Sequence, residues 1–148
     1  MVKIIKIGFV LSALSFVMLS CKTSAQNTSI QSVSYSHTFG RGGATSITAS
    51  QDSLESSSRG GRVAQFPNIK KKITSQDWQK LVSGINLSVL QKTKGGEQRG
   101  VYDGADEIFR IKTSDKEYEL YNVPAESAGY KQLEQLKTDL ENLLPKYK

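Results

Sequence analysis

One histidine and three clustered acids are the residues best equipped for chemistry. His37 is the only histidine in the 148-residue chain, and an imidazole acts as a general base or as a metal ligand. Asp103, Asp106 and Glu107 lie in the segment YDGADE, where clustered carboxylate oxygens suit calcium and other hard cations. A small metal-dependent hydrolase built on His37, Asp103 and Asp106 is therefore one alternative function.

The spacing of these residues nevertheless favours structural roles. His37 alternates with Val33, Tyr35 and Phe39 in the pattern of a half-buried strand, and no second base or ligand motif accompanies it. The three acids depart from the D-x-D-x-D-G spacing of a calcium loop, so we expect them in a solvated loop. No G-x-S-x-G segment surrounds any serine. The sequence thus predicts no enzyme, and it assigns no catalytic residue, cofactor or metal site.

A glycine-rich tetrapeptide, Gly40-Arg41-Gly42-Gly43, is a second candidate for binding. Exposed backbone N–H groups in such a loop can hold an anion, and the arginine adds positive charge. The segment lacks the lysine and the Ser/Thr of a P-loop, and no helix pattern follows it. We expect a hairpin turn and keep the four residues as a candidate interaction loop.

The only cysteine, Cys21, follows an apolar segment. Met1–Lys6 carries two lysines, and the 13 residues of Ile7–Leu19 carry no charge. A basic segment followed by a short apolar segment is the layout of a secretory signal. The apolar segment is too short for a membrane-spanning helix, which requires about 20 apolar residues. Since no other cysteine is available, Cys21 cannot form a disulfide within the chain.

The segment Met18-Leu19-Ser20-Cys21 resembles a bacterial lipobox, the motif read by the lipoprotein signal peptidase. The resemblance implies a signal peptide of residues 1–20, acyl chains such as palmitate on Cys21, and a small lipoprotein of the cell envelope. Several acyl chains hold a protein stably to a membrane, here the outer membrane or the periplasmic face. In the alternative interpretation, cleavage after Ala25 releases a soluble secreted domain.

The remaining composition indicates one domain. Without residues 1–20 the chain has 128 residues, and its net charge falls from +6 to +4 as the two signal lysines are lost. Residues 21–29 are small and polar, which predicts a flexible tether, and residues 30–148 form a single domain. The basic residues are scattered apart from positions 70–72 and are not interleaved with aromatic residues. We therefore expect no nucleic-acid partner.

The first part of the domain predicts strands followed by a helix. Period-two alternation from Ile30 and a second strand at Ala44–Ala49 flank the glycine-rich turn as a hairpin. Asp52–Ser58 is a further strand candidate, and Asn68–Ile73 is a candidate edge strand. The helix signals are a capping-box pair, Thr74 with Asp77, and an apolar i, i+3, i+4, i+7 repeat from Trp78 to Ile85. Gly84 and Asn86 weaken the pattern, so the helix is expected to end near them. The apolar segment Leu87–Leu90 is left unassigned.

The second part predicts another hairpin and a last helix. Glu107–Lys112 and Lys116–Val123 flank a turn-forming Thr-Ser-Asp group. From about Ser127 to Leu144, leucines recur on one helix face, and Pro145 follows. The order of strands, helix, hairpin and helix predicts an α+β fold in which two helices cover one face of an antiparallel sheet.

This order of elements resembles the layout of the emfourin group of metalloprotease inhibitors over about residues 30–144. The resemblance concerns layout, so it implies an inhibitor-like role without assigning a residue. In the absence of a catalytic set, the sequence favours a non-enzymatic binding or interaction module. Its expected partners are the membrane, through the lipid, and an envelope protein. Protease inhibition is the first alternative and metal-dependent hydrolysis the second.

Overall fold

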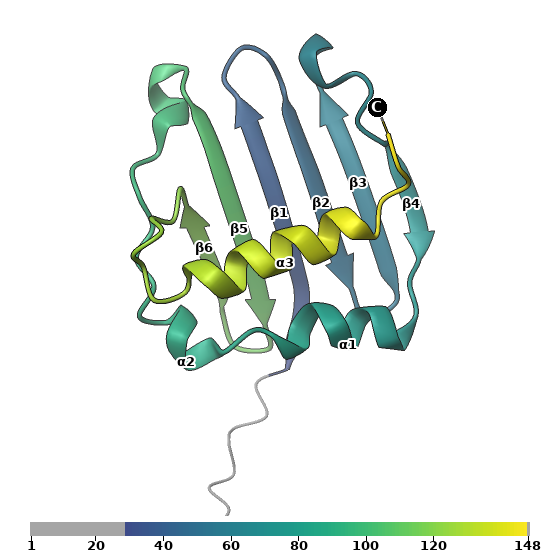
Figure 1. Ribbon diagram of the computed structural model, residues 1–148, viewed down its shortest axis with the longest axis vertical. Helices are drawn as coiled ribbons and strands as arrows, with labels where there is room; N and C mark the ends of the chain where they lie inside the picture. The colour runs from purple at the N-terminus through teal and green to yellow at the C-terminus, as the bar shows by residue number, and fades with distance from the viewer. Residues whose placement is uncertain (1–28, 148) are drawn as a thin grey trace, which may run out of the picture.

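The computed structural model describes residues 29–147. Six strands form one antiparallel sheet in the order β4-β3-β2-β1-β5-β6, and helices pack on one side of it (Figure 1), which confirms the predicted α+β fold. The strands are β1 (Ile30–Phe39), β2 (Ala44–Ser50), β3 (Ser53–Arg59), β4 (Ile69–Lys72), β5 (Ala105–Thr113) and β6 (Glu117–Tyr121). The helices are α1 (Ser75–Ser83), α2 (Leu87–Leu90) and α3 (Tyr130–Asn142), with 3-10 turns η1 (Gly61–Val63) and η2 (Arg99–Tyr102).

Alternation along the strands gives the sheet one apolar and one polar face. Val33, Ile47 and Phe109 point toward the helices, and each is at most 2% exposed. On the other face small hydroxyl side chains face each other, as Ser36 and Ser46 do across β1 and β2 with a 3.0 Å hydrogen bond. Because only one face is apolar, the helices cover only that face (Figure 1).

Helix α1 begins where the sequence predicts. The Asp77 N–H donates to Thr74 Oγ1 at 3.1 Å, and the Thr74 N–H donates to the Asp77 carboxylate at 3.1 Å, which completes a capping box. Trp78 and Leu81 are buried on the apolar side of the helix. The unassigned segment Leu87–Leu90 forms the short helix α2, whose first N–H groups donate to the Asn86 side chain.

Helix α3 crosses the sheet and supplies much of the helical core. Its fully buried leucines are Leu133, Leu136 and Leu140. The helix begins at Tyr130 rather than near Ser127, because the preceding residues form turns in which Ser127 donates to the Pro124 carbonyl and Tyr130 to that of Ser127. An ion pair of 3.1 Å between Lys80 of α1 and the buried Asp139 joins the two helices.

The central pairing of the sheet joins segments that are far apart in the chain. β5 pairs with β1 along its whole length, so the N-terminal and C-terminal hairpins become one sheet. As a result, the β1–β2 turn, η1 and η2 all lie at the upper end of the molecule in Figure 1. The first residue of β1, Ile30, lies at the lower end. This arrangement assembles the site described next.

The predictions for the N-terminal segment lie outside the described residues. They concern the signal of residues 1–20, the lipidation of Cys21 and most of the tether at 21–29. Between residues 29 and 147, no helix is long and apolar enough to cross a lipid bilayer.

Candidate functional site

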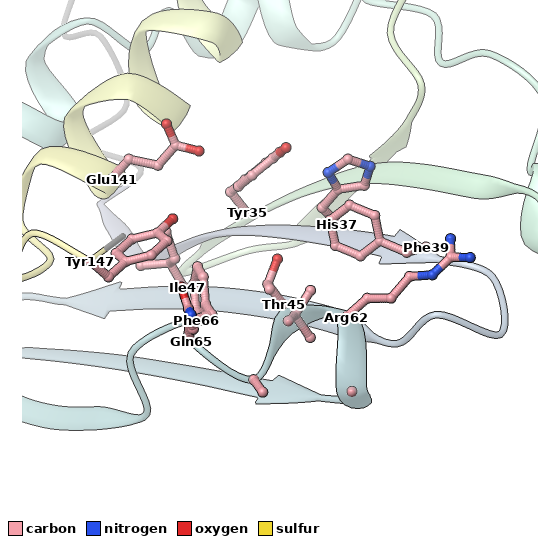
Figure 2. A pocket seen from close by; sticks show the side chains of 13 residues that line it. Tyr35, His37, Phe39, Thr45, Ile47, Arg62, Gln65, Phe66, Glu141 and Tyr147 are labelled. Carbon is pink, nitrogen blue, oxygen red and sulfur yellow. The ribbon is translucent and has the colours of Figure 1, made fainter.

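A pocket of about 520 Å³ opens on the helix-bearing face of the sheet, beside the C-terminal end of α3 (Figure 2). Small-molecule sites usually have volumes of about 300–1,000 Å³. Rings and aliphatic groups line this pocket together with a comparable polar surface, to which Thr45, Arg62, Gln65 and Glu141 contribute. The pocket therefore has both the size and the lining of a ligand site.

Strands β1 and β2 form the floor of the pocket. Tyr35, His37 and Phe39 alternate along β1 and so face the same side. Thr45 and Ile47 of β2 lie beside them as the register partners of His37 and Tyr35. The rings of His37 and Phe39 lie 4.1 Å apart between centroids. Because β1 and β2 are inner strands of the sheet, this floor is held from both sides.

The opposite wall comes from the chain after β3 and from the C-terminal segment. Residues 61–66 line the pocket, and Phe66 packs edge-to-face on Tyr147 with 5.5 Å between ring centroids. Glu141, near the end of α3, adds a carboxylate (Figure 2). The pocket is thus built from β1, β2, the segment after β3 and the end of the chain.

Tyr35 connects the floor to a polar network. Its hydroxyl donates to Glu107 Oε1 at 2.7 Å, and Lys137 Nζ donates to the same oxygen at 2.6 Å. Burial raises the pKa of Tyr35 well above its usual range, and the hydrogen bond to Glu107 adds to this effect. Burial also acts to raise the pKa of Glu107, but the hydrogen bonds from Lys137 and Tyr35 outweigh it and lower that pKa. Glu107 is therefore an ionised acceptor whose donors are in place.

His37 is an uncharged ring at neutral pH. Burial lowers its pKa, and the charge of Lys137 lowers it further against the opposing effect of Glu107. Strand register places Thr45 on one side of His37 and Glu107 on the other. Among the described residues, however, no hydrogen bond joins these three side chains. Thr45, His37 and Glu107 therefore do not form the hydrogen-bonded hydroxyl, imidazole and carboxylate of a catalytic triad.

The structure separates the three acids considered as metal ligands. Asp103 forms a 3.2 Å ion pair with Arg41 at the surface. Asp106 and Glu107 are neighbours in β5 and so point to opposite faces of the sheet, with Glu107 on the side of His37. Within residues 29–147, no three His, Cys, Asp or Glu side chains are grouped so that they could hold a metal ion. The three acids do not share a site.

Asp106 instead fixes the loop that precedes β5. Its buried carboxylate accepts the backbone N–H groups of Arg99 and Gly100, each at 2.7 Å, and the side-chain amide of Asn122. Burial acts to raise the pKa of Asp106, but these hydrogen bonds outweigh it and lower the pKa. The carboxylate is therefore a structural anchor for η2.

The candidate interaction loop, Gly40 to Gly43, is the β1–β2 turn, as predicted. The Phe39 N–H closes it by donating to the Gly43 carbonyl at 2.8 Å. Gly43 (φ +124°) and Gly60 (φ +102°) both have backbone angles that favour glycine, and their backbones are in contact. A Cβ on Gly43 would collide with the carbonyl oxygen of Arg59. The turn therefore packs directly on the segment that forms the opposite wall of the pocket.

Sequence reasoning did not single out Arg62, Phe66 or Glu141 as site residues. They reach the pocket only through the long-range pairing of the sheet and the return of the C-terminal segment, and no local motif marks them. The one available signal was the repetition of a glycine-arginine pattern, at 40–43 and again at 59–62. Comparison of the chain with protein-family models and with curated proteins finds no match.

Proposed function

We propose that the chain is a lipid-anchored protein of the cell envelope whose domain is a non-enzymatic binding module, with the pocket as its ligand site. The observation that carries the proposal is the preformed, ring-lined space of about 520 Å³. Its floor is made of inner strands, so little ordering is required when a ligand binds. An envelope protein is a further candidate partner, beyond this small-molecule site.

The polar groups near the floor support binding more than catalysis. Tyr35 and Lys137 both donate hydrogen bonds to Glu107, and the raised pKa of Tyr35 keeps its hydroxyl protonated, so it does not act as a base. His37 faces the pocket as an uncharged ring and lacks a hydrogen-bonded orienting group among the described residues. These groups give the pocket rigidity and a ring surface, which are the properties that a binding site requires.

The position of the pocket along β1 suits a tethered receptor. The tether of residues 21–29 would join the domain at Ile30, whereas His37 and Phe39 lie near the other end of the ten-residue strand. At about 3.3 Å per residue, that separation is roughly 23–30 Å. A lipid on Cys21 would therefore leave the pocket on the far side of the domain from the membrane attachment, open to ligands in solution.

We expect the intact mass of the protein from its native membrane fraction to match a chain that begins at Cys21 and carries three acyl groups. The Cys21→Ser variant should lose this added mass and its membrane association, because serine offers no sulfur for the lipid. Mass spectrometry of both proteins checks the prediction. A mass that begins at Gln26 without lipid would contradict the anchor and favour the soluble secreted alternative.

Binding in the pocket is tested with indole-3-acetamide, a neutral bicyclic ligand, added to the isotope-labelled full chain in detergent micelles. We expect the backbone-amide NMR resonances of residues 61–66 to shift as the ligand is added. The expected Kd is on the order of 1 mM, because ligands of this kind gain about −0.3 kcal/mol of binding free energy per non-hydrogen atom. Ala64, an exposed residue of the lining, offers a way to fill the space. Ala64→Phe should weaken binding at least about tenfold by occupying it.

The matched control is Ala125→Phe, an equally large change at an exposed alanine outside the pocket lining. It should leave the Kd within about twofold of the wild-type value. Shifts spread over the whole domain, or equal effects of the two substitutions, would contradict the assignment of the pocket as the ligand site.

A further inference from the structure

Arginine is concentrated at the upper end of the molecule. Four of the five arginines of the chain are exposed in or beside the turns at this end (Figure 1): Arg41, Arg59, Arg62 and Arg99. Unlike the compact ammonium group of lysine, a planar guanidinium binds a carboxylate through two parallel hydrogen bonds. This end of the domain is therefore suited to carboxylate groups.

Arg62 is the arginine that lines the pocket. Its side-chain stem lies over Gly42 of the β1–β2 turn, where a Cβ would be 2.8 Å from Arg62 Cδ. The absence of a side chain at Gly42 thus leaves the space that the stem occupies. Because Gly43 and Gly60 hold the two turns together, backbone contacts set the position of Arg62 relative to the pocket floor.

The Arg62 guanidinium has no ion-pair partner among residues 29–147. Two acids at this end of the molecule already have partners: Asp103 pairs with Arg41, and Asp106 accepts backbone N–H groups. Glu141 also lines the pocket, but Figure 2 shows its carboxylate and the Arg62 guanidinium on opposite sides of the space. An anionic group is therefore attracted at the Arg62 side and repelled at the Glu141 side.

We infer that the pocket binds a small aromatic carboxylic acid, with its ring over Phe39, Ile47 and Phe66 and its carboxylate on the Arg62 guanidinium. This inference rests on the proposed function and names the ligand class of the same site. One guanidinium matches one carboxylate, because the two groups pair through both oxygens. The uncharged His37 adds a ring surface to the floor without a charge that would compete with Arg62.

The test compares indole-3-acetate with indole-3-acetamide on the full chain in detergent micelles, by the same NMR titration. The two ligands share a ring and nearly the same shape, and they differ in charge. We expect the acetate to bind about tenfold more tightly than the amide, because charge-assisted hydrogen bonds to arginine are stronger than neutral ones. The measured quantity is the ratio of the two Kd values.

Arg62→Gln should reduce this ratio to within about twofold, whereas Arg59→Gln, at the same end but outside the lining, should retain it. A wild-type ratio near one, or a tenfold ratio that survives Arg62→Gln, would overturn the assignment of the carboxylate to Arg62 and leave the pocket as a site for neutral ligands. If neither ligand shifts the resonances of residues 61–66, the proposed function itself fails.

Discussion

Replacing Gly43 by alanine should destabilise the fold by about 2–4 kcal/mol, because the residue has φ +124° and packs backbone against backbone. The added Cβ would meet the Arg59 carbonyl oxygen, which cannot rotate away as a side chain could. The β1–β2 turn and the segment after β3 would have to separate, and the wall of the pocket would move with them. Urea unfolding, followed by the fluorescence of the single tryptophan, Trp78, measures the change.

Gly61→Ala is the matched control for this substitution. Gly61 lies in the same glycine-rich wall, but a Cβ there would meet no atom within 4 Å, and its φ lies outside the range that favours glycine. Its free energy of unfolding should stay within about 0.5 kcal/mol of the wild-type value. Equal losses for both variants would mean that the contact between the two turns does not stabilise the domain.

Replacing Leu140 by alanine should lower the free energy of unfolding by about 2–5 kcal/mol. Leu140 is fully buried between α3 and the sheet, and α3 is held on the sheet by its row of leucines. Removal of three carbon atoms loses the burial of apolar surface and leaves a cavity that the surrounding inner strands cannot close completely. The same urea titration measures the effect, with the slope of the transition as the check that cooperativity is kept.

Gln135→Ala is the control on the exposed side of the same helix. Alanine is a good helix former, and the glutamine is not part of the core, so the expected change is within about 0.5 kcal/mol. If Leu140→Ala were as mild as this control, α3 would not be a principal part of the core. Because Glu141 lies on α3, such a result would also weaken the assignment of the pocket wall.

Short-range patterns in the sequence were sufficient for most of the elements. The pair Thr74 and Asp77 marks the start of α1 because a capping box involves only residues three apart. The alternation around His37 identifies β1 because side chains two apart share a face. The start of α3 was placed too early, at Ser127, because the turns before Tyr130 contain no residue that excludes a helix.

The positions of Asp106 and Glu107 could not be predicted from short-range patterns. Asp106 and Glu107 are adjacent in the sequence. The predicted strand began at Glu107, which placed Asp106 in the preceding loop together with Asp103. The strand begins at Ala105 instead, so the two carboxylates point to opposite faces and bond to different partners. The start of β5 depends on its pairing with β1, which no local pattern specifies.

The sequence by itself determined the type and order of the six strands and of α1 and α3, and the apolar face of each, because these depend on residues a few positions apart, but it left α2 unassigned. Only the tertiary structure decided that β1, the segment after β3 and the C-terminal segment enclose one pocket. Its two charged residues, Arg62 and Glu141, are 79 positions apart in the chain. They line the same pocket because strand pairing, the contact of Gly43 with Gly60 and the packing of α3 act together, and each of these requires the complete fold.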